Sequence, residues 1–250
     1  MKIAQHPCSR VEKLQGLTRK LWFGCRPLIP IEGRYPMFRA MFRLAVALVA
    51  AMSTLLGGCS SGVEPEQLSP TCLARADFGD PAESLYILPY PVGAAYEVAQ
   101  GYCGSGPWSS HNERFAIDFF IPIGAPLVAS RAGIVVYVID EFDDSGMNDD
   151  SMLNYIVIQH EDGTAALYAH LQQRSATVEL GDTVATGERI ANSGNSGFTD
   201  NNPHLHFELY SQFPYHWKDD SIPVTFRNAG GPLDERGGLQ YGVTYTALPW

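Results

Sequence analysis

The stretch HLHFEL, residues 204–209, alternates polar and apolar side chains with a period of two. In a β-strand, residues i and i+2 point to the same face, so His204, His206 and Glu208 share one face of such a strand. The opposite face carries only apolar residues, Leu205, Phe207 and Leu209. A strand with one core-facing side and two histidines on its polar side predicts a metal site or an acid–base site.

Other segments of the chain also have the composition of β-strands. Residues 115–121, 133–139, 154–159 and 165–171 are rich in Val, Ile, Tyr, Phe or Leu and are separated by turn residues. The dipeptide Asp162-Gly163 between two of them is typical of a tight hairpin. No segment has a sustained helical period. We therefore predict an all-β domain, a small domain of antiparallel sheets.

The charge is unevenly distributed along the 250 residues. Of the 17 Lys and Arg, nine lie in residues 1–58 together with two of the 27 Asp and Glu, so residues 59–250 hold eight basic and 25 acidic residues. A domain this acidic is a poor partner for nucleic acid, and we expect no nucleic-acid binding. The basic first quarter needs a separate explanation.

Residues 37–58 have the pattern of a secretory signal peptide. Arg39 and Arg43 precede the uncharged run 44–56, which is short for a membrane span, although a single-span anchor is the alternative. The segment LGGC, which ends at Cys59, resembles the lipobox of bacterial lipoproteins. That resemblance implies lipidation of Cys59 and a membrane-anchored, periplasm-facing protein of the cell envelope. Ser60 after the cysteine implies the outer membrane. Residues 1–36 are then an over-called start, which means that the true start codon lies after them. Residues 59–84 begin with a polar tether.

Lipidation of Cys59 leaves two cysteines in the mature chain, Cys72 and Cys103. In an oxidising periplasm two such residues favour a disulfide, against the alternative of two buried free thiols. The sequence contains no CxxC pair, which argues against a thiolate zinc site.

Ligand-type residues occur in further segments besides HLHFEL. Asp118 interrupts the apolar run FAIDFF, His111 lies seven positions earlier, and His170 follows the apolar run ALYA. A buried carboxylate is costly unless it is paired or metal-bound. Two histidines and one carboxylate suit zinc with a fourth position left for water. Singly, a histidine is more often a surface or core residue, and only the combination predicts a site.

The segments SHNERFAIDF, LYAHL and GNSGFTDNNPHLHFEL resemble the three motifs of the lysostaphin-type, or LytM-like, zinc metalloendopeptidases. The resemblance covers roughly residues 90–212, so we expect the metallopeptidase domain at 85–212, followed by a C-terminal tail or arm at 213–250. It implies a duplicated hybrid motif of antiparallel sheets and an enzyme that cuts stem or cross-link peptides of peptidoglycan.

Position by position, the resemblance implies one zinc per chain, held by His111, Asp118 and His206. His170 and His204 match the two catalytic histidines that do not bind the metal. Six residues separate His111 from Asp118, as in a longer variant of the family motif, so the loop between them must bulge. Tyr102 and Trp108 either line the cleft or are ordinary packing residues.

Two other roles remain open at this point. Some members of the family have lost ligands and act as non-catalytic activators of amidases, which would give this chain a regulatory protein partner. All five site positions are retained here, which favours a zinc metalloendopeptidase. The family resemblance also leaves Gly-rich proteins as an alternative substrate.

Overall fold

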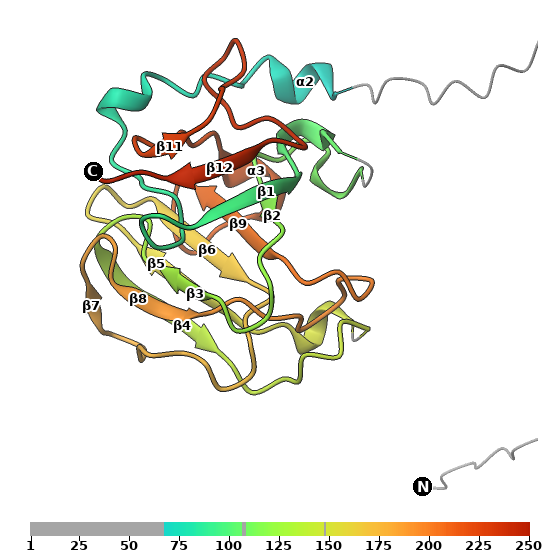
Figure 1. Cartoon of the computed structure of the whole chain (residues 1–250), viewed down its shortest axis with the longest axis vertical. Coiled ribbons are helices and arrows are strands. Elements are labelled where there is room, and N and C mark those ends of the chain that lie inside the picture. The colour runs from blue at the N-terminus through green and yellow to red at the C-terminus, as the bar shows by residue number, and fades with distance from the viewer. Residues whose placement is uncertain (1–67, 107–108, 148) are drawn as a thin grey trace, which may run out of the picture. The chain divides into compact units, whose positions relative to one another are not determined.

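The computed structural model describes residues 68–106, 109–147 and 149–250 (Figure 1). The predicted signal peptide, the over-called start and Cys59 lie outside the described residues. Within the described part, no helix has the length and apolar character needed to cross a bilayer.

The fold is dominated by one antiparallel sheet of ten strands. Its order is β11-β12-β1-β2-β9-β6-β5-β4-β7, and β10 pairs with β9 off this path. These strands are β1 (Ala95–Gln100), β2 (Ile117–Phe119), β4 (Gly133–Ile139), β5 (Tyr155–Gln159), β6 (Ala165–Ala169), β7 (Thr183–Val184), β9 (Leu205–Tyr210), β10 (Ser221–Ile222), β11 (Ala229–Gly230) and β12 (Thr244–Ala247).

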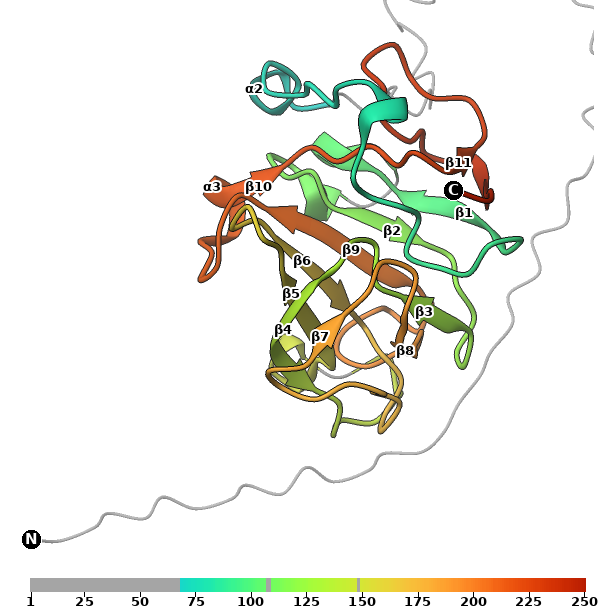
Figure 2. The ribbon, with the colours of Figure 1, turned by 90° about the vertical axis from the view of Figure 1, so that its left-hand side faces the viewer.

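A second sheet has two antiparallel strands, β3 (Pro126–Val128) and β8 (Arg189–Asn192). It lies with β4 and β7 in the lower half of Figures 1 and 2. Among the described residues the only α-helices are single turns, α2 (Pro70–Leu73) and α3 (Trp217–Asp220). Four 3₁₀ turns complete the elements, η1 (Pro81–Glu83), η2 (Tyr102–Gly104), η3 (Ser109–His111) and η4 (Asp150–Met152). The prediction of an all-β antiparallel domain is confirmed.

Strand β9 is central, because it pairs with β2 on one side and β6 on the other. Its alternation places Leu205, Phe207 and Leu209 in the main hydrophobic core, where each is at most 3% exposed. A shift of one residue would turn these side chains out of the core, so burial determines the register. The opposite face of β9 is thereby assigned to His206 and Glu208.

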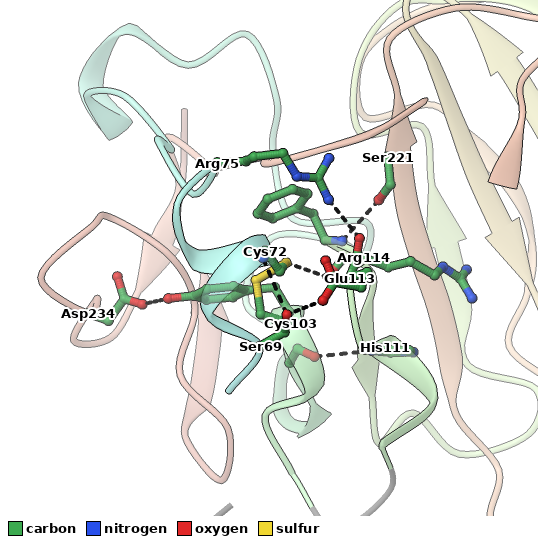
Figure 3. Close-up of a disulfide and its surroundings, with 12 residues drawn as sticks. Ser69, Cys72, Arg75, Cys103, His111, Glu113, Arg114, Ser221 and Asp234 are labelled. Carbon is green, nitrogen blue, oxygen red and sulfur yellow. Dashed lines mark hydrogen bonds between the residues drawn. A yellow bond between two sulfur atoms is a disulfide. The ribbon is translucent and has the colours of Figure 1, made fainter. Parts of the chain in front are cut away.

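The segment before β1 is attached to the loop that follows β1. A disulfide joins Cys72 in α2 to Cys103 in η2, and both cysteines are fully buried (Figure 3). Phe78, Tyr102 and Phe115 pack around it as a small separate apolar cluster. The described part of the expected tether, residues 68–84, therefore includes a segment that packs on the domain.

The C-terminal residues 213–250, expected as a tail or arm, contribute three strands to the large sheet. β10 pairs with β9, and β12 pairs with β1. Val224 and Phe226 lie in the same core as β9. The sheet thus continues beyond residue 212 to Ala247.

A glycine allows residues 193–197 to pack against the end of β6. The Gly194 backbone N–H donates to the carbonyl of His170 (3.0 Å), and a Cβ at Gly194 would overlap the backbone of Leu171 and Gln172. The close approach of two backbones therefore requires glycine here.

We expect removal of the disulfide to destabilise the domain. The paired replacement Cys72→Ala and Cys103→Ala opens a loop with a sequence separation of 31 residues. The free energy of unfolding should fall by about 3 kcal/mol, because the unfolded chain gains conformational freedom. Urea unfolding of the oxidised parent and the variant measures the difference. Equal midpoints and slopes would contradict a stabilising role.

We expect Gly194→Ala to destabilise the domain by about 3 kcal/mol, because backbone atoms cannot yield as a flexible side chain does. Gly124→Ala is the matched control. Gly124 has φ of +88° but nothing within 4 Å of an added Cβ, so only backbone strain of about 1 kcal/mol is expected there. Thermal unfolding of both variants tests this, and equal losses would exclude the proposed backbone overlap.

Candidate metal centre

The pairing of β9 brings the predicted site residues together. Asp118 in β2 is the direct cross-strand partner of His206, and Ala169 in β6 is its partner on the other side. Directly opposed residues in an antiparallel pair point to the same face. Asp118 and His206 therefore face the same side, and His170 follows immediately after Ala169.

His111 reaches this face from the loop between β1 and β2. It ends the 3₁₀ turn η3, is 2% exposed, and its Nδ1 lies 3.2 Å from the carbonyl oxygen of Gly101. The longer spacing before Asp118 is accommodated by a turn in which the Arg114 N–H donates to the His111 carbonyl (3.0 Å). Glu113, inside this turn, has φ of +65°.

His111, Asp118 and His206 form a compact set of ligand atoms that all lie within 4.8 Å of one another. Asp118 Oδ1 is 2.9 Å from His206 Nδ1, and Asp118 Oδ2 is 3.4 Å from His111 Nε2. Among the described residues no other group of three such side chains converges in this way. Two imidazoles and one carboxylate fit the donor set that zinc takes when a position is left for water or substrate.

His170 and His204 lie beside this set. Their ring centroids are 4.5 Å apart, and His204 Nε2 is 3.9 Å from Asp118 Oδ2. The backbone of His170 has φ of 61°, a conformation that is uncommon for residues other than glycine. The structure thus brings together all five residues selected from the sequence.

Hydrogen bonds orient the histidine rings. Backbone carbonyls accept from His111 Nδ1 (Gly101), His170 Nδ1 (Ser196, 2.8 Å) and His204 Nδ1 (Asn202, 2.7 Å). Since a carbonyl only accepts, each Nδ1 is assigned the proton and each Nε2 keeps its lone pair. His111 thereby presents Nε2 to Asp118 Oδ2 in a form able to bind a metal.

Burial and neighbouring charge shift the ionisation of these groups. Burial lowers the pKa of His111 to about 4 and that of His170 to about 3. Burial opposes ionisation of Asp118, but His111, His204 and His206 outweigh it and hold the Asp118 pKa below its usual range. Burial likewise opposes protonation of His206, yet hydrogen bonds to Asp118 and Glu208 raise its pKa.

A buried ion pair lies beneath His206. The Arg114 Nε donates to Glu208 Oε1 (2.9 Å), and the Arg114 Nη2 forms a second, short contact with Oε2. The Glu208 side chain is fully buried. Burial opposes its ionisation, but the hydrogen bond from Arg114 outweighs this and keeps the Glu208 pKa below its ordinary value.

The five site residues line one cavity of about 510 Å³. Its lining also includes two exposed phenylalanines, Phe120 at 39% and Phe198 at 55% exposure, and two exposed carboxylates, Asp150 and Asp200. The metal set therefore lies at a recess with exposed aromatic side chains along it rather than on a flat surface.

Three further aromatic residues lie outside the site or outside the described residues. Tyr102 is buried against Phe78 and Phe115 and is a packing residue, while Trp108 lies outside the described residues. His160, at the turn after β5, is 4% exposed because it packs edge-on against Tyr86. Its Nδ1 lies 2.9 Å from the Ala132 carbonyl.

Arg114 was not selected from the sequence. An arginine that follows a histidine in a loop has no periodic pattern that distinguishes it from a surface residue. The signal in the sequence was Glu208, which lies on the polar face of a strand beside two histidines. If that face is buried, its carboxylate needs a cationic partner.

Comparison with known proteins finds a family that part of the chain resembles. The model of peptidase family M23 matches residues 112–217, a range that contains Asp118, His170, His204 and His206 and begins one residue after His111.

The peptidoglycan DD-endopeptidase ShyA of Vibrio cholerae is 39% identical over 126 residues, which are 48% of this chain and 26% of ShyA. Lysostaphin of Staphylococcus simulans is 30% identical over 160 residues, 58% of this chain and 30% of lysostaphin. The chain thus spans less than a third of these relatives. The solved catalytic domain of lysostaphin is 24% identical, with a TM-score of 0.38 over 52% of this chain and 87% of that domain.

The family match covers the segments that carry Asp118, His170, His204 and His206. Residues 112–217 of the chain are therefore similar to peptidase family M23.

Proposed function

We propose that this protein is a zinc-dependent endopeptidase that hydrolyses peptide bonds in peptidoglycan. The observation that carries the proposal is the convergence of His111, Asp118 and His206 within 4.8 Å, with His170 and His204 beside them in one cavity. The relatives add support, since ShyA is a peptidoglycan endopeptidase by name.

The proposed ligands are His111 Nε2, one or both oxygens of Asp118, and His206 Nδ1, the atoms that face one another. A bound zinc ion supplies Lewis acidity and lowers the pKa of water toward neutrality. Asp118 adds a negative charge that partly offsets the charge of the cation. The carbonyl of Gly101 keeps the His111 ring in the orientation that this role requires.

His170 and His204 are the proposed proton carriers. Each has Nδ1 against a backbone carbonyl, which leaves Nε2 free to accept a proton from water and to return it to the leaving amine. Once protonated, the same Nε2–H donates to the oxygen on which negative charge develops. Because burial lowers the pKa of His170, this ring is neutral at neutral pH and is able to accept a proton.

Metal binding and proton transfer can be separated by comparing a variant of a proposed ligand with a variant of a proposed proton carrier. His206→Ala should reduce bound zinc from about one per chain to near zero and abolish cleavage. His170→Ala should retain zinc and reduce kcat by about 10²- to 10⁴-fold, the usual contribution of a general acid–base group. Elemental analysis and muropeptide release from purified sacculi measure the two properties.

The matched control is His216→Ala, since His216 is exposed and is not part of the cavity lining. It should retain both zinc and activity. A folded parent with neither zinc nor cleavage would contradict the proposal and favour an activator of a cell-wall amidase. Zinc-dependent cleavage of Gly-rich protein substrates but not of sacculi would contradict the peptidoglycan assignment alone.

We further propose that the protein is anchored by lipid at Cys59 and faces the periplasm from the outer membrane. The support is the LGGC segment after an apolar run and the serine at position 60. Cys59→Ser should move the protein from the outer-membrane fraction to another fraction, and lipid labelling should be lost. Unchanged labelling and fractionation in the variant would contradict this proposal.

A further inference from the structure

We infer that Glu208 and Arg114 are positioning residues for His206: the buried carboxylate accepts from the Nε2–H of this ring and so directs its Nδ1 toward Asp118 and His111. The inference rests on the proposed function, because it concerns the orientation of a proposed zinc ligand. It assigns a role to a pair of charged residues that do not themselves hold the metal.

The position of His206 explains why a side chain is needed for this role. His111, His170 and His204 lie in loops or at a strand end, and each is oriented by a backbone carbonyl. His206 instead lies inside β9, with β2 and β6 paired on its two sides. Carbonyls of paired strands are committed to hydrogen bonds within the sheet. An acceptor for His206 must therefore come from a side chain.

Glu208 supplies that acceptor from two positions along the same strand face. Its Oε2 is 3.4 Å from His206 Nε2 and also accepts from the Tyr210 hydroxyl (2.7 Å). Its Oε1 accepts from the Ser221 hydroxyl (2.7 Å). With these donors and Arg114, the carboxylate is surrounded by groups that can only stabilise its ionised form.

Arg114 offsets the cost of burying that carboxylate. Its guanidinium donates to both oxygens of Glu208, the bidentate geometry that favours arginine over lysine. Its Nη2 lies 3.2 Å from His206 Nε2. The guanidinium has no acceptor, so a proton held on Nε2 has Glu208 as its acceptor, and this form of the ring leaves Nδ1 unprotonated for the metal. The ionised carboxylate, kept in place by Arg114, thus favours the Nε2–H form of His206.

Arg114 also connects two ligands. Its backbone N–H closes the turn that holds His111, while its side chain holds the acceptor of His206. Figure 3 shows the base of this turn, where Ser69 and Arg75 contact Glu113 beside the disulfide. Loss of the side chain of Arg114 should therefore loosen the His206 ring without removing any ligand atom.

The test is the double replacement Arg114→Met and Glu208→Leu, which removes both charges and leaves neither unpaired. The zinc dissociation constant, measured by chelator competition, should rise about 10- to 100-fold, the usual effect of removing a group that orients a metal ligand. Circular dichroism establishes that the variant is folded. A dissociation constant within about twofold of the parent value would overturn the inference.

The matched control is Arg131→Met with Asp162→Leu. This ion pair has an Nη1 to Oδ2 distance of 2.6 Å and does not line the cavity. It should leave the zinc dissociation constant unchanged, and an equal rise in both double variants would overturn a specific role for Arg114 and Glu208. If the unmutated protein binds no zinc, that result contradicts the proposed function, and this inference is overturned together with it.

A second measurement uses the unmutated protein and does not depend on the folding of a variant. In the zinc-loaded protein labelled with ¹⁵N-histidine, a long-range ¹H–¹⁵N spectrum reports the proton position on each ring. The expected signature is a His206 ring with Nε2 protonated and Nδ1 bound to the metal. A His206 ring protonated at Nδ1 and bound through Nε2 would overturn the inference.

Discussion

The pairing of β9 between β2 and β6 is the constraint on which the rest of the site depends. Burial of Leu205, Phe207 and Leu209 determines which face of β9 is turned inward, and the pairing then sets Asp118 directly opposite His206. A one-residue slip would exchange the two faces of β9 and separate the carboxylate from the imidazole. The hydrophobic core and the metal centre are therefore two consequences of one register.

The residues in regular strands were those that the sequence could predict. A period of two assigns His204, His206 and Glu208 to one face without knowledge of the fold, and Asp118 is conspicuous because it interrupts an apolar run. The family resemblance added the roles of ligand and proton carrier. Loop positions were harder, since the turn that returns His111 to the site depends on contacts with residues distant in the sequence.

Two further features also depend on contacts between residues that are distant in the sequence. His160 follows a strand at a turn, which favours exposure, yet the chain before β1 brings Tyr86 against its ring and buries it. Residues 213–250, expected as a C-terminal tail or arm, contain the short strands β10 and β12, which pair with β9 and β1. Two to four residues are too few for periodicity to be detected, and only tertiary pairing stabilises them as strands.

The presence of Arg114 at this site is explained by the need of buried polar groups for hydrogen-bond partners. No local sequence pattern indicates it. A histidine in the middle of a sheet lacks a nearby free carbonyl, so its second nitrogen requires a side-chain acceptor. A buried acceptor with sufficient strength is a carboxylate, and a buried carboxylate requires a cation. The chain supplies that cation from the turn that already carries His111. One loop therefore provides a proposed metal ligand directly and holds a second one through Glu208, which makes the geometry of the loop and that of β9 interdependent.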